Sequence, residues 1–524
     1  MHNAGLLALL ALFPIADSVV PPARPRLIVV ITVDQLRPDY FTRWKSQLTG
    51  GLGQLANEGA FFTQGYQDHA LTETAPGHST ILSGTWPAHN GIIRNSEGVQ
   101  DTLAPLIGIA GPGASPRRFR GTTLFDWLKA ADPTARALSV SRKDRGAILP
   151  IGHAKEQVYW YQSGMFTTSR YYSDTLPAWV QAFNARRLPF KAANMTWTLL
   201  LPDSAYQEPD SELWESGGSN VTFPHRLPAD SLRAALALPG FPAIDSLTLL
   251  FALDGFEALK LGRKGTDILA VSLSGTDAVG HVFGPDSREL HDQVLRLDRS
   301  LAWFIKRVTD RVGRDNVVVV LTADHGVTSF AARTRAKGGT AYDVFLDSLI
   351  TSVNAELDRV AGTSRQWLEF DLGMLLMRDN GRFAAMGIRV DSILDVLTPR
   401  ILRVPGVARV IKPADLARAD TASDPVARRW LHHLTPDAGV ALTVSLQPGS
   451  VWGYSGAPLA SHGQPSDDDT HVPIIFWGSG IRKGAYATRM NTVDIAPTLA
   501  ALLGISPLSL VDGRARTDAL MPRN

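Results

Sequence analysis

The chain has 524 residues, enough for one large α/β domain with insertions or for several smaller domains. Its formal net charge of +2 is close to neutral for this length, which argues against a dedicated nucleic-acid-binding protein with a basic stripe. The chain contains no cysteine, so it forms no disulfide bonds, and any metal ion must be held by His, Asp, Glu or Thr side chains.

The chain begins with an apolar segment that is typical of a secretory signal. Residues 5–16 read GLLALLALFPIA, a run of roughly a dozen residues that is too short to cross a bilayer. A proline-rich stretch follows at residues 21–25. We expect residues 1–18 to be a signal peptide, the protein to be secreted or periplasmic, and no integral membrane segment to remain after cleavage. The alternative is a buried N-terminal helix, against which Pro14 and the proline-rich stretch argue.

Apolar runs along the chain predict a sheet whose strands are buried on both faces. Three such runs predict parallel strands, at residues 27–33, 267–273 and 316–321. A fourth run at residues 472–477 is a further candidate strand, with a proline near its start. Helical patterns lie between the runs, at residues 53–58, 124–131, 287–312 and 492–503. This alternation predicts an α/β fold, a doubly wound sheet with helices on both faces.

Two stretches interrupt the alternation, and we expect both to be insertions over the functional face of the sheet. The first, at about residues 146–242, is rich in aromatic residues and loops. The second, at about residues 340–449, contains short strands and helices of its own.

Acidic residues follow the ends of the predicted strands. Asp34 follows the first run directly, Asp277 comes shortly after the second, and Asp324 after the third. In open α/β sheets, functional sites form beyond the carboxyl ends of the strands. Carboxylates gathered there repel one another unless a cation lies between them, so the pattern predicts a metal site. Asp34 alone could simply cap the next helix.

Histidines accompany these acids. His281 lies four residues after Asp277, His325 follows Asp324, and His462 lies in a loop before the fourth run. Mixed imidazole and carboxylate ligands suit zinc better than calcium or magnesium, and the residues suffice for two sites of roughly three protein ligands each. A lone pair of this kind could be a surface ion pair, and His471 competes with His462 for the last position.

A threonine lies where a helix is predicted to begin. Thr74 stands in the segment TETAPGH, which leads into the helix-like stretch STIL. A hydroxyl at a helix N-terminus lies at the positive end of the helix dipole, near free backbone N–H groups that can bind phosphate oxygens. By itself, Thr74 could be an ordinary helix cap.

These segments, taken in order, resemble the alkaline phosphatase superfamily. The similar motifs are VDQLRPDY at residues 33–40, TETAPGHSTILSGTWPAHNGIIRN at 72–95, SGTDAVGHVFGPDS at 274–287, LTADHG at 321–326, SHG at 461–463 and DTHVPIIFWG at 469–478. The chain looks most like the monomeric, phosphate-irrepressible branch, whose nucleophile is a threonine, and the nucleotide pyrophosphatase/phosphodiesterases are near relatives. The resemblance implies that residues 26–524 form one alkaline-phosphatase-like catalytic domain with the two insertions over its active-site face.

The resemblance also implies a role for each candidate residue. Thr74 would be the nucleophile, and Asn95 would donate a hydrogen bond to a phosphoryl oxygen, together with the backbone N–H groups after Thr74. The ligands of the first zinc, which activates Thr74, would be Thr74 itself with Asp34, Asp324 and His325. The ligands of the second zinc, which activates water, would be Asp277, His281 and His462.

Lys143 and Arg145 are the residues that favour a phosphate monoester over a diester as the expected substrate. In an extended segment, residues two apart point the same way, so both cations would face one pocket and suit the dianion of a phosphate monoester. The segment KDRGAILPIGH is similar to the monoesterase branch of the family. Without the rest of the segment, residues 143–145 would be interpreted as a run of charged residues on the solvent-exposed surface.

The sequence therefore predicts a secreted, zinc-dependent alkaline phosphatase that converts phosphate monoesters to an alcohol and inorganic phosphate through a covalent phosphothreonine. The resemblance to the monomeric branch implies that the enzyme is a monomer. A phosphodiesterase on the same site is the first alternative. A sulfatase is disfavoured because it needs Cys or Ser at the position of Thr74 and an arginine where His78 stands. A phosphomutase is disfavoured by the export signal, and a non-catalytic binding protein by the completeness of the site.

Overall fold

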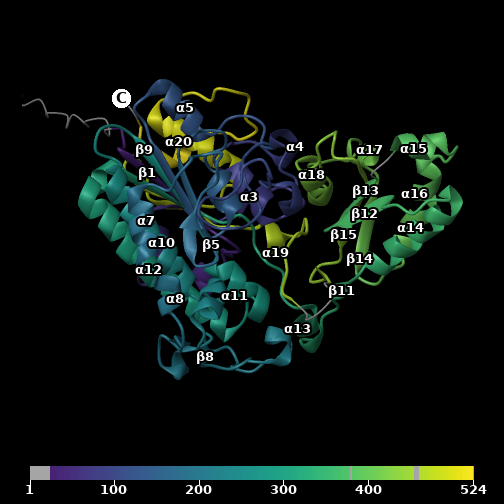
Figure 1. The fold of residues 1–524 in the computed structure, drawn as a ribbon, viewed down its shortest axis with the longest axis horizontal. Coiled ribbons are helices and arrows are strands. Elements are labelled where there is room, and N and C mark those ends of the chain that lie inside the picture. The colour runs from purple at the N-terminus through teal and green to yellow at the C-terminus, as the bar shows by residue number, and fades with distance from the viewer. Residues whose placement is uncertain (1–23, 378–379, 454–458, 523–524) are drawn as a thin grey trace, which may run out of the picture.

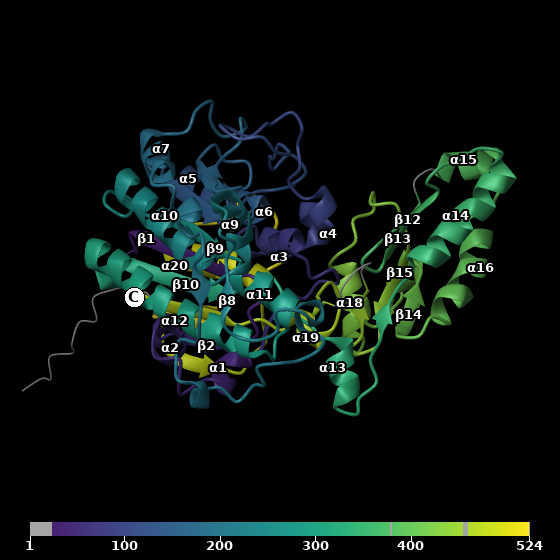
Figure 2. The ribbon, with the colours of Figure 1, turned by 60° about the horizontal axis from the view of Figure 1, so that its bottom comes forward.

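The computed structural model describes residues 24–377, 380–453 and 459–522. The predicted signal peptide, residues 1–18, lies outside the described residues. The chain forms a main body built on a nine-stranded sheet and a second lobe built on a four-stranded sheet (Figures 1 and 2).

The main sheet is mixed, with five parallel strands at its centre. The strands in spatial order are β18 (Gly484–Tyr486), β2 (Ala60–Phe62), β17 (Ile474–Gly478), β10 (Val317–Thr322), β1 (Leu27–Val33), β9 (Asp267–Leu273), β4 (Ala137–Ser141), β5 (Gln157–Gln162) and β6 (Met165–Thr167). The strands β10, β1, β9, β4 and β5 are parallel, while β17 and β6 run antiparallel beside them. The three predicted parallel strands are therefore direct neighbours, and the fourth run forms an antiparallel strand.

Helices cover both faces of this sheet, as the fully apolar strands predicted. The helices of the main body are α1 (Tyr40–Arg43), α2 (Gly51–Glu58), α3 (Thr74–Ile81), α4 (Pro87–Asn90), α5 (Leu124–Ala131), α6 (Asp144–Ile148), α7 (Ala178–Ala185), α8 (Leu188–Lys191), α9 (Ser231–Ala237), α10 (Ala243–Leu259), α11 (Gly275–Phe283), α12 (Arg288–Val312), α13 (Ala331–Ala336), α19 (Asp467–Thr470) and α20 (Ile495–Leu503). Figure 1 shows α10 and α12 on one side of the sheet and α5 and α20 on the other. The fold class expected from the sequence is confirmed.

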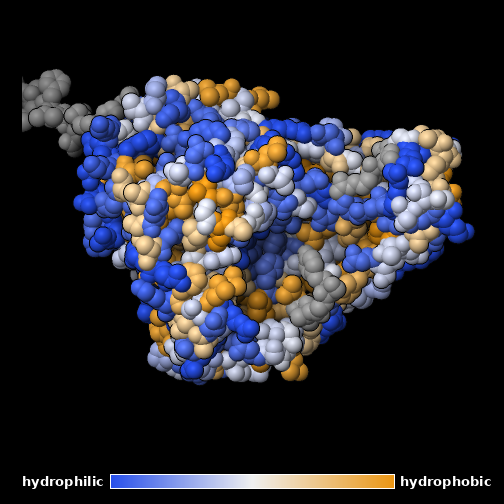
Figure 3. All heavy atoms as spheres, viewed as in Figure 1, coloured by the Kyte–Doolittle hydropathy of each residue, from blue (hydrophilic) through white to orange (hydrophobic). Residues whose placement is uncertain are grey.

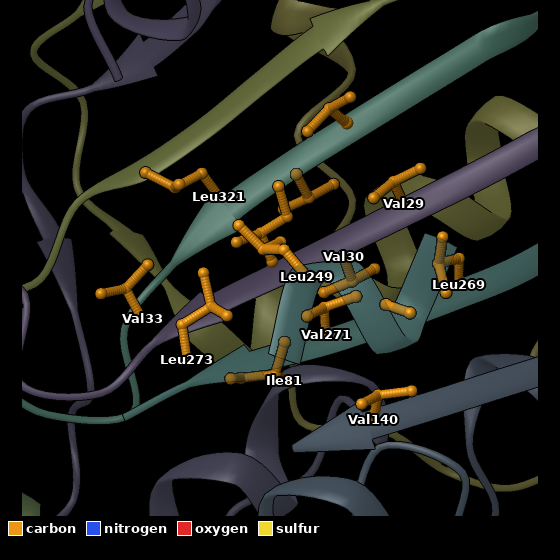
Figure 4. Close-up of a cluster of buried hydrophobic side chains, with 14 of the residues drawn as sticks. Val29, Val30, Val33, Ile81, Val140, Leu249, Leu269, Val271, Leu273 and Leu321 are labelled. Carbon is orange, nitrogen blue, oxygen red and sulfur yellow. The ribbon is translucent and has the colours of Figure 1, made fainter. Parts of the chain in front are cut away.

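The core lies between the parallel strands and these helices. Val30, Val271 and Leu273 pack in one cluster with Leu249 of α10 and Ile81 of α3 (Figure 4). All of these side chains are buried, and burying each one stabilises the fold by roughly 1.5–3 kcal/mol. The cluster anchors helix α3, which carries Thr74 at its first position, against the centre of the sheet.

The first predicted insertion, at about residues 146–242, overlaps the main sheet. Strands β5 and β6 fall within it and extend the sheet beyond β4, so this part of the prediction is wrong. Tyr159, Trp160 and Tyr161, which helped to suggest an insertion, are core residues of β5. The ring of Tyr159, for example, packs edge-on against Trp179 of α7 and Phe251 of α10. The remaining part contains helices α7, α8 and α9 and the short pair β7 (Thr196–Trp197) and β8 (His225–Arg226).

The second lobe occupies much of the span expected for the second insertion, residues 340–449. Its strands are β12 (Leu368–Asp371), β13 (Met374–Met377), β15 (Val440–Leu446) and β14 (Val407–Ile411), all antiparallel. Its helices are α14 (Asp347–Ala361), α15 (Asn380–Ala385), α16 (Val390–Leu402), α17 (Pro413–Leu416) and α18 (Pro425–Leu431). Two short parallel pairs complete the strands: β3 (Gly65–Tyr66) with β19 (Met490–Asn491), and β11 (Asp343–Val344) with β16 (Val451–Trp452). The lobe has a core of its own around Trp367, Phe383 and Leu397.

The second lobe packs against the loops that surround Thr74. Its buried residues Met374, Leu376 and Trp430 share a hydrophobic cluster with Leu71 and Ile93 of the main body. These two residues lie shortly before Thr74 and Asn95 in the chain, so the lobe helps to fix the position of both.

Within the described residues, no single helix has the length and apolar character needed to cross a membrane, although the bent pair 231–240 and 243–259 meets that test by length and composition.

Candidate active site

The candidate residues gather at the carboxyl edge of the parallel strands. Asp34 follows β1, Asp277 lies in α11 just after β9, Asp324 follows β10, and Lys143 follows β4. Because these strands are parallel neighbours, their carboxyl ends meet at one edge. Figure 3 shows hydrophilic side chains lining a hollow between the main body and the second lobe.

Helix α3 places Thr74 at this edge. The helix begins at Thr74, and all eight of its residues are buried. At Gly77 the helix backbone approaches so closely that a Cβ atom would lie 2.1 Å from the carbonyl oxygen of Asp324. Only glycine permits this approach. The start of the helix is therefore held directly against the strand end that carries Asp324 and His325.

In a first group, Asp34 and Asp324 offer ligand atoms within 4.8 Å of each other and of a ring nitrogen of His78, and His325 lies beside Asp324. Asp34 accepts hydrogen bonds from the hydroxyls of Ser274 (2.8 Å) and Ser272 (3.2 Å). His325 Nδ1 lies 2.9 Å from the carbonyl oxygen of Gly326 and donates to it, so Nε2 carries no proton and can act as an acceptor. That Nε2 and Oδ2 of Asp324 lie 3.4 Å apart, and both are buried with no hydrogen-bond partner among the described residues.

Nε2 of His325 has no donor among the described residues, and Oδ2 of Asp324 faces the ring nitrogen Nδ1 of His78 at 3.3 Å. A divalent cation between the two buried acceptors would offset the cost of burying them. Burial lowers the pKa of His325 to about 4, so its imidazole is neutral and able to bind a metal ion.

Asp277, His281 and His462 form a second group. His281 Nδ1 donates to the carbonyl of Ala460 (2.8 Å), and His462 Nδ1 donates to the carbonyl of Thr72 (2.6 Å). Both Nε2 atoms then point inward, 3.2 Å from each other and 3.3 and 3.7 Å from Oδ1 of Asp277. Backbone carbonyls that fix the tautomer of a histidine in this way are typical of metal ligands.

A cation is needed at this second group as well. Burial lowers the pKa of His462, whereas Asp277 raises the pKa of His281 against the effect of burial. A proton on His281 is therefore the alternative to a metal ion at this position. The ligand atoms of Asp277, His281 and His462 all lie within 4.8 Å of one another, as a metal ion requires.

His471 lies outside both groups. Its Nε2 hydrogen bonds to the carbonyl oxygen of Thr63 (2.9 Å), and its ring stacks on Tyr66. The ring of His462, in contrast, stacks on that of His325 at 3.6 Å. Of the two histidines that the sequence left open, the structure brings His462 to the site.

Lys143 connects the two groups and the threonine. Its Nζ lies 2.9 Å from Asp34 Oδ2, 2.8 Å from Asp277 Oδ2 and 3.1 Å from the hydroxyl of Thr74. Burial opposes the charge of this ammonium, but the two carboxylates outweigh it and raise the pKa of Lys143. The lysine is therefore charged and donates to the Thr74 oxygen.

Lys143 and Arg145 line one cavity, but the segment that carries them is not extended as expected. Residues 143–145 are not extended throughout, because helix α6 begins at Asp144. The carboxylate of Asp144 accepts a hydrogen bond from the backbone N–H of Arg145 (2.7 Å), which favours the helical turn. Arg145 pairs with Asp144 at 3.5 Å, and its Nε is buried with no hydrogen-bond partner among the described residues.

Asn95 is held by a residue that the sequence analysis missed. The carboxylate of Glu73 accepts hydrogen bonds from both the backbone N–H and the side-chain amide of Asn95, each at 2.9 Å. Burial raises the pKa of Glu73 to about 7. The only signal in the sequence is an acid directly before a helix, which is usually read as a cap.

The backbone N–H groups after Thr74 are not available to a ligand, contrary to expectation. The N–H of Ala75 donates to Asn95 Oδ1 (2.8 Å), Pro76 has none, and the N–H of Gly77 donates to the carbonyl of Glu73 (2.9 Å). A phosphate oxygen at this site would therefore depend on side chains rather than on these backbone groups.

His78 is a second residue that sequence reasoning did not place. It lies fully buried between the carboxylates of Asp34 (3.6 Å) and Asp324 (3.3 Å), with ring nitrogens near the Thr74 carbonyl (2.9 Å) and the Ser272 hydroxyl (3.0 Å). Burial opposes its protonation, but Asp324 and Asp34 raise its pKa. His78 therefore orients the same carboxylates that could bind a metal ion.

An α/β sheet with two buried carboxylate–imidazole groups beside a threonine hydroxyl defines the architecture of a metal-dependent hydrolase. The model of the type I phosphodiesterase/nucleotide pyrophosphatase family matches residues 28–110 and 113–384. The chain is 33% identical to alkaline phosphatase PhoV of Synechococcus elongatus, across 95% of this chain and 93% of that protein. It is 30% identical to alkaline phosphatase PafA of Elizabethkingia meningoseptica, across 95% of each chain.

Solved structures agree with this assignment. A crystal structure of PafA superposes with a TM-score of 0.88 at 29% identity, covering 96% of this chain and all of the other. Murine ectonucleotide pyrophosphatase/phosphodiesterase 5 shares the fold, with a TM-score of 0.54 at 16% identity, covering 94% of this chain and all of the other. The chain belongs to the type I phosphodiesterase/nucleotide pyrophosphatase family and is a phosphoric ester hydrolase, as the resemblance of its motifs implied.

Proposed function

We propose that the protein is an alkaline phosphatase that hydrolyses phosphate monoesters to an alcohol and inorganic phosphate, through a covalent phosphothreonine at Thr74. The observation that carries this proposal is the position of the Lys143 ammonium, 3.1 Å from the Thr74 hydroxyl and in contact with Asp34 and Asp277 of the two ligand groups. A nucleophile, a cation and two potential metal sites thus meet at one point.

The relatives support the monoesterase assignment. PhoV and PafA are both named alkaline phosphatases. A solved PafA variant has one threonine replaced by serine and an asparagine, a lysine and an arginine replaced by alanine. The threonine and asparagine have the same separation in both chains, as have the lysine and arginine. These spacings match Thr74 with Asn95 and Lys143 with Arg145, which supports a role for all four here.

We propose zinc as the metal, with two ions per chain. Thr74 with Asp34, Asp324 and His325 would hold one ion, and Asp277 with His281 and His462 the other, because imidazole and carboxylate ligands suit zinc. When bound, the ions supply Lewis acidity that lowers the pKa of a coordinated hydroxyl or water and offsets charge on the phosphoryl group.

The residues of this chain carry out two in-line displacements. The Thr74 oxygen forms a bond to phosphorus as the bond from phosphorus to the ester oxygen breaks, and water then displaces the Thr74 oxygen to release inorganic phosphate. Lys143 donates a hydrogen bond to the Thr74 oxygen and stabilises its negative charge. Asn95, held by Glu73, has a second amide N–H for a phosphoryl oxygen.

The charge beside Thr74 favours a monoester. A monoester dianion carries more negative charge than a diester, and Lys143 and Arg145 offer two cations on this side of the site. The family description favours the second candidate, a phosphodiesterase. The ratio of kcat/KM for 4-nitrophenyl phosphate to that for bis(4-nitrophenyl) phosphate decides between them: a ratio well above one supports the phosphatase, and a ratio below one supports the diesterase.

We also propose that the enzyme is exported and acts as a monomer outside the cytosol, after removal of residues 1–18. The apolar run at residues 5–16 supports export. Comparison of the N-terminus of the purified native protein with the gene-encoded one tests it, since an intact Met1 in the mature enzyme contradicts cleavage.

A further inference from the structure

A cavity of about 350 Å³ lies at the ends of β4 and β5, on the same edge of the sheet as the metal groups. Its lining consists mainly of Arg142, Lys143, Arg145, Gln162, Ser163 and Leu236. Because β10, β1, β9, β4 and β5 are consecutive parallel strands, this cavity continues the row formed by Asp324, Asp34, Asp277 and Lys143.

The charges in this cavity do not balance. Lys143 is paired with Asp34 and Asp277, and Arg145 is paired with Asp144, the only acid in the lining. Arg142 forms no ion pair or hydrogen bond with any part of the chain that the structure describes. One guanidinium therefore faces the cavity without a partner.

Neutral polar groups lie beside this guanidinium. The side chains of Gln162 and Ser163 also form no hydrogen bond within the described ranges, so both are free to bind a ligand. The hydroxyl of Tyr161, in contrast, already donates to the carbonyl of Ala235 (2.7 Å). An unpaired arginine with an amide and a hydroxyl has the donor groups that bind phosphate or carboxylate oxygens.

Lys143 connects this cavity to the reaction centre. The residue lines the cavity, while its Nζ lies 3.1 Å from the Thr74 hydroxyl. We propose that the cavity binds a second anionic group, a phosphate or a carboxylate, on the leaving group of the substrate. Arg142 is then a specificity-determining residue that favours esters with a further negative charge. This inference rests on the proposed phosphatase function.

Matched substrates test the subsite. We would measure kcat/KM of the metal-loaded enzyme for hexyl phosphate, hexane-1,6-diyl bisphosphate and 6-(phosphonooxy)hexanoate, which share one carbon chain and differ in the far group. In Arg142→Gln, the ratio of the bisphosphate to hexyl phosphate falls about tenfold relative to wild type, the equivalent of one charge-assisted hydrogen bond. The control Arg299→Gln changes an exposed arginine of α12 and leaves the ratio unchanged.

The outcomes are distinct. A fall for both anionic substrates supports a general anion subsite, and a fall for only one of them assigns the subsite to phosphate or to carboxylate. Equal losses on all three substrates, or no loss on any, overturn the proposal. If wild type hydrolyses none of the three esters, nor 4-nitrophenyl phosphate, the proposed function itself fails. Calorimetric titration with hexane-1,6-diyl bisphosphonate, which cannot be hydrolysed, then still measures whether Arg142 binds the far group.

Discussion

The ammonium of Lys143 lies 3.1 Å from the hydroxyl of Thr74, although 69 residues separate them in the chain. The two come together because Lys143 follows strand β4 while Thr74 begins helix α3, which packs over the same sheet edge. The contact stabilises negative charge on the Thr74 oxygen, the charge that a nucleophilic attack requires.

Loss of Lys143 should act selectively on monoesters. We predict that Lys143→Ala lowers kcat/KM for 4-nitrophenyl phosphate roughly tenfold more than for bis(4-nitrophenyl) phosphate, because the dianion gains more from a nearby cation. Arg145→Ala should act in the same direction. The control is Lys306→Ala, which removes an exposed lysine paired with Asp310 on α12. Equal losses on both esters would show that Lys143 acts on the nucleophile alone.

Glu73 should act through Asn95. We expect Glu73→Ala to lower kcat/KM for 4-nitrophenyl phosphate by about 10- to 100-fold, since a small displacement of a positioning group costs this much. Glu73→Gln keeps one acceptor for Asn95 and should lose less. The double variant Glu73→Ala/Asn95→Ala should be no worse than Asn95→Ala, because the two residues act as one unit. Additive losses would separate their roles.

Metal content should distinguish the two histidines that the sequence left open. We predict that His462→Ala holds one metal ion fewer per chain than wild type after dialysis, while His471→Ala holds the wild-type amount, because His471 binds the Thr63 carbonyl instead. Atomic emission of the purified proteins measures this. Loss of an ion in His471→Ala and none in His462→Ala would contradict a metal site formed by Asp277, His281 and His462.

Removal of the metal should also lower stability. Saturation of a site with ligand at a thousandfold excess over Kd stabilises the folded state by about 4 kcal/mol. A chelator should therefore lower the Tm of wild type, and lower that of His462→Ala by less. An unchanged Tm would contradict a metal ion bound among these buried carboxylates.

Asp245 should make stability depend on pH. Burial raises the pKa of this carboxyl from 3.8 to about 7, so the folded state holds a proton that the unfolded state releases. Its contribution to stability is thus full below about pH 4 and is lost as pH rises to about 7, on the order of a few kcal/mol.

An amide at this position avoids the effect. In Asp245→Asn, the side-chain oxygen still accepts the N–H of Gly275 (2.8 Å). Gln293 can turn its buried Oε1, which has no partner in the described part of the chain, toward the new amide. We expect the free energy of unfolding of Asp245→Asn, measured in urea, to rise relative to that of wild type as the pH increases from 4 to 8. A difference that is constant across this range would contradict the pKa argument.

The strands and the metal groups could be predicted because they depend on patterns that are visible in the amino-acid sequence itself. Apolar runs marked β1, β9 and β10, and the carboxyl ends of parallel strands place Asp34, Asp277 and Asp324 at one edge whatever their separation in the chain. The neighbouring histidines followed from the same rule.

Other features depend on three-dimensional context. The aromatic residues of β5 resembled a loop insertion because burial between α7 and α10 cannot be read from composition. Residues 143–145 turn into a helix through contacts of Asp144. Glu73 and His78 act through hydrogen bonds to Asn95 and to two distant carboxylates, so no local pattern identifies them.

The central claim is that Thr74 carries the phosphoryl group during turnover. Rapid acid quenching of the metal-loaded enzyme with a monoester at low pH, followed by peptide mass spectrometry, measures it directly. We predict a phosphoryl group on Thr74 of the wild type, none on the corresponding peptide of Thr74→Ala, and a loss of kcat of about a thousandfold or more in that variant. Full turnover by Thr74→Ala, or a phosphoryl group on another residue, would contradict the proposed mechanism.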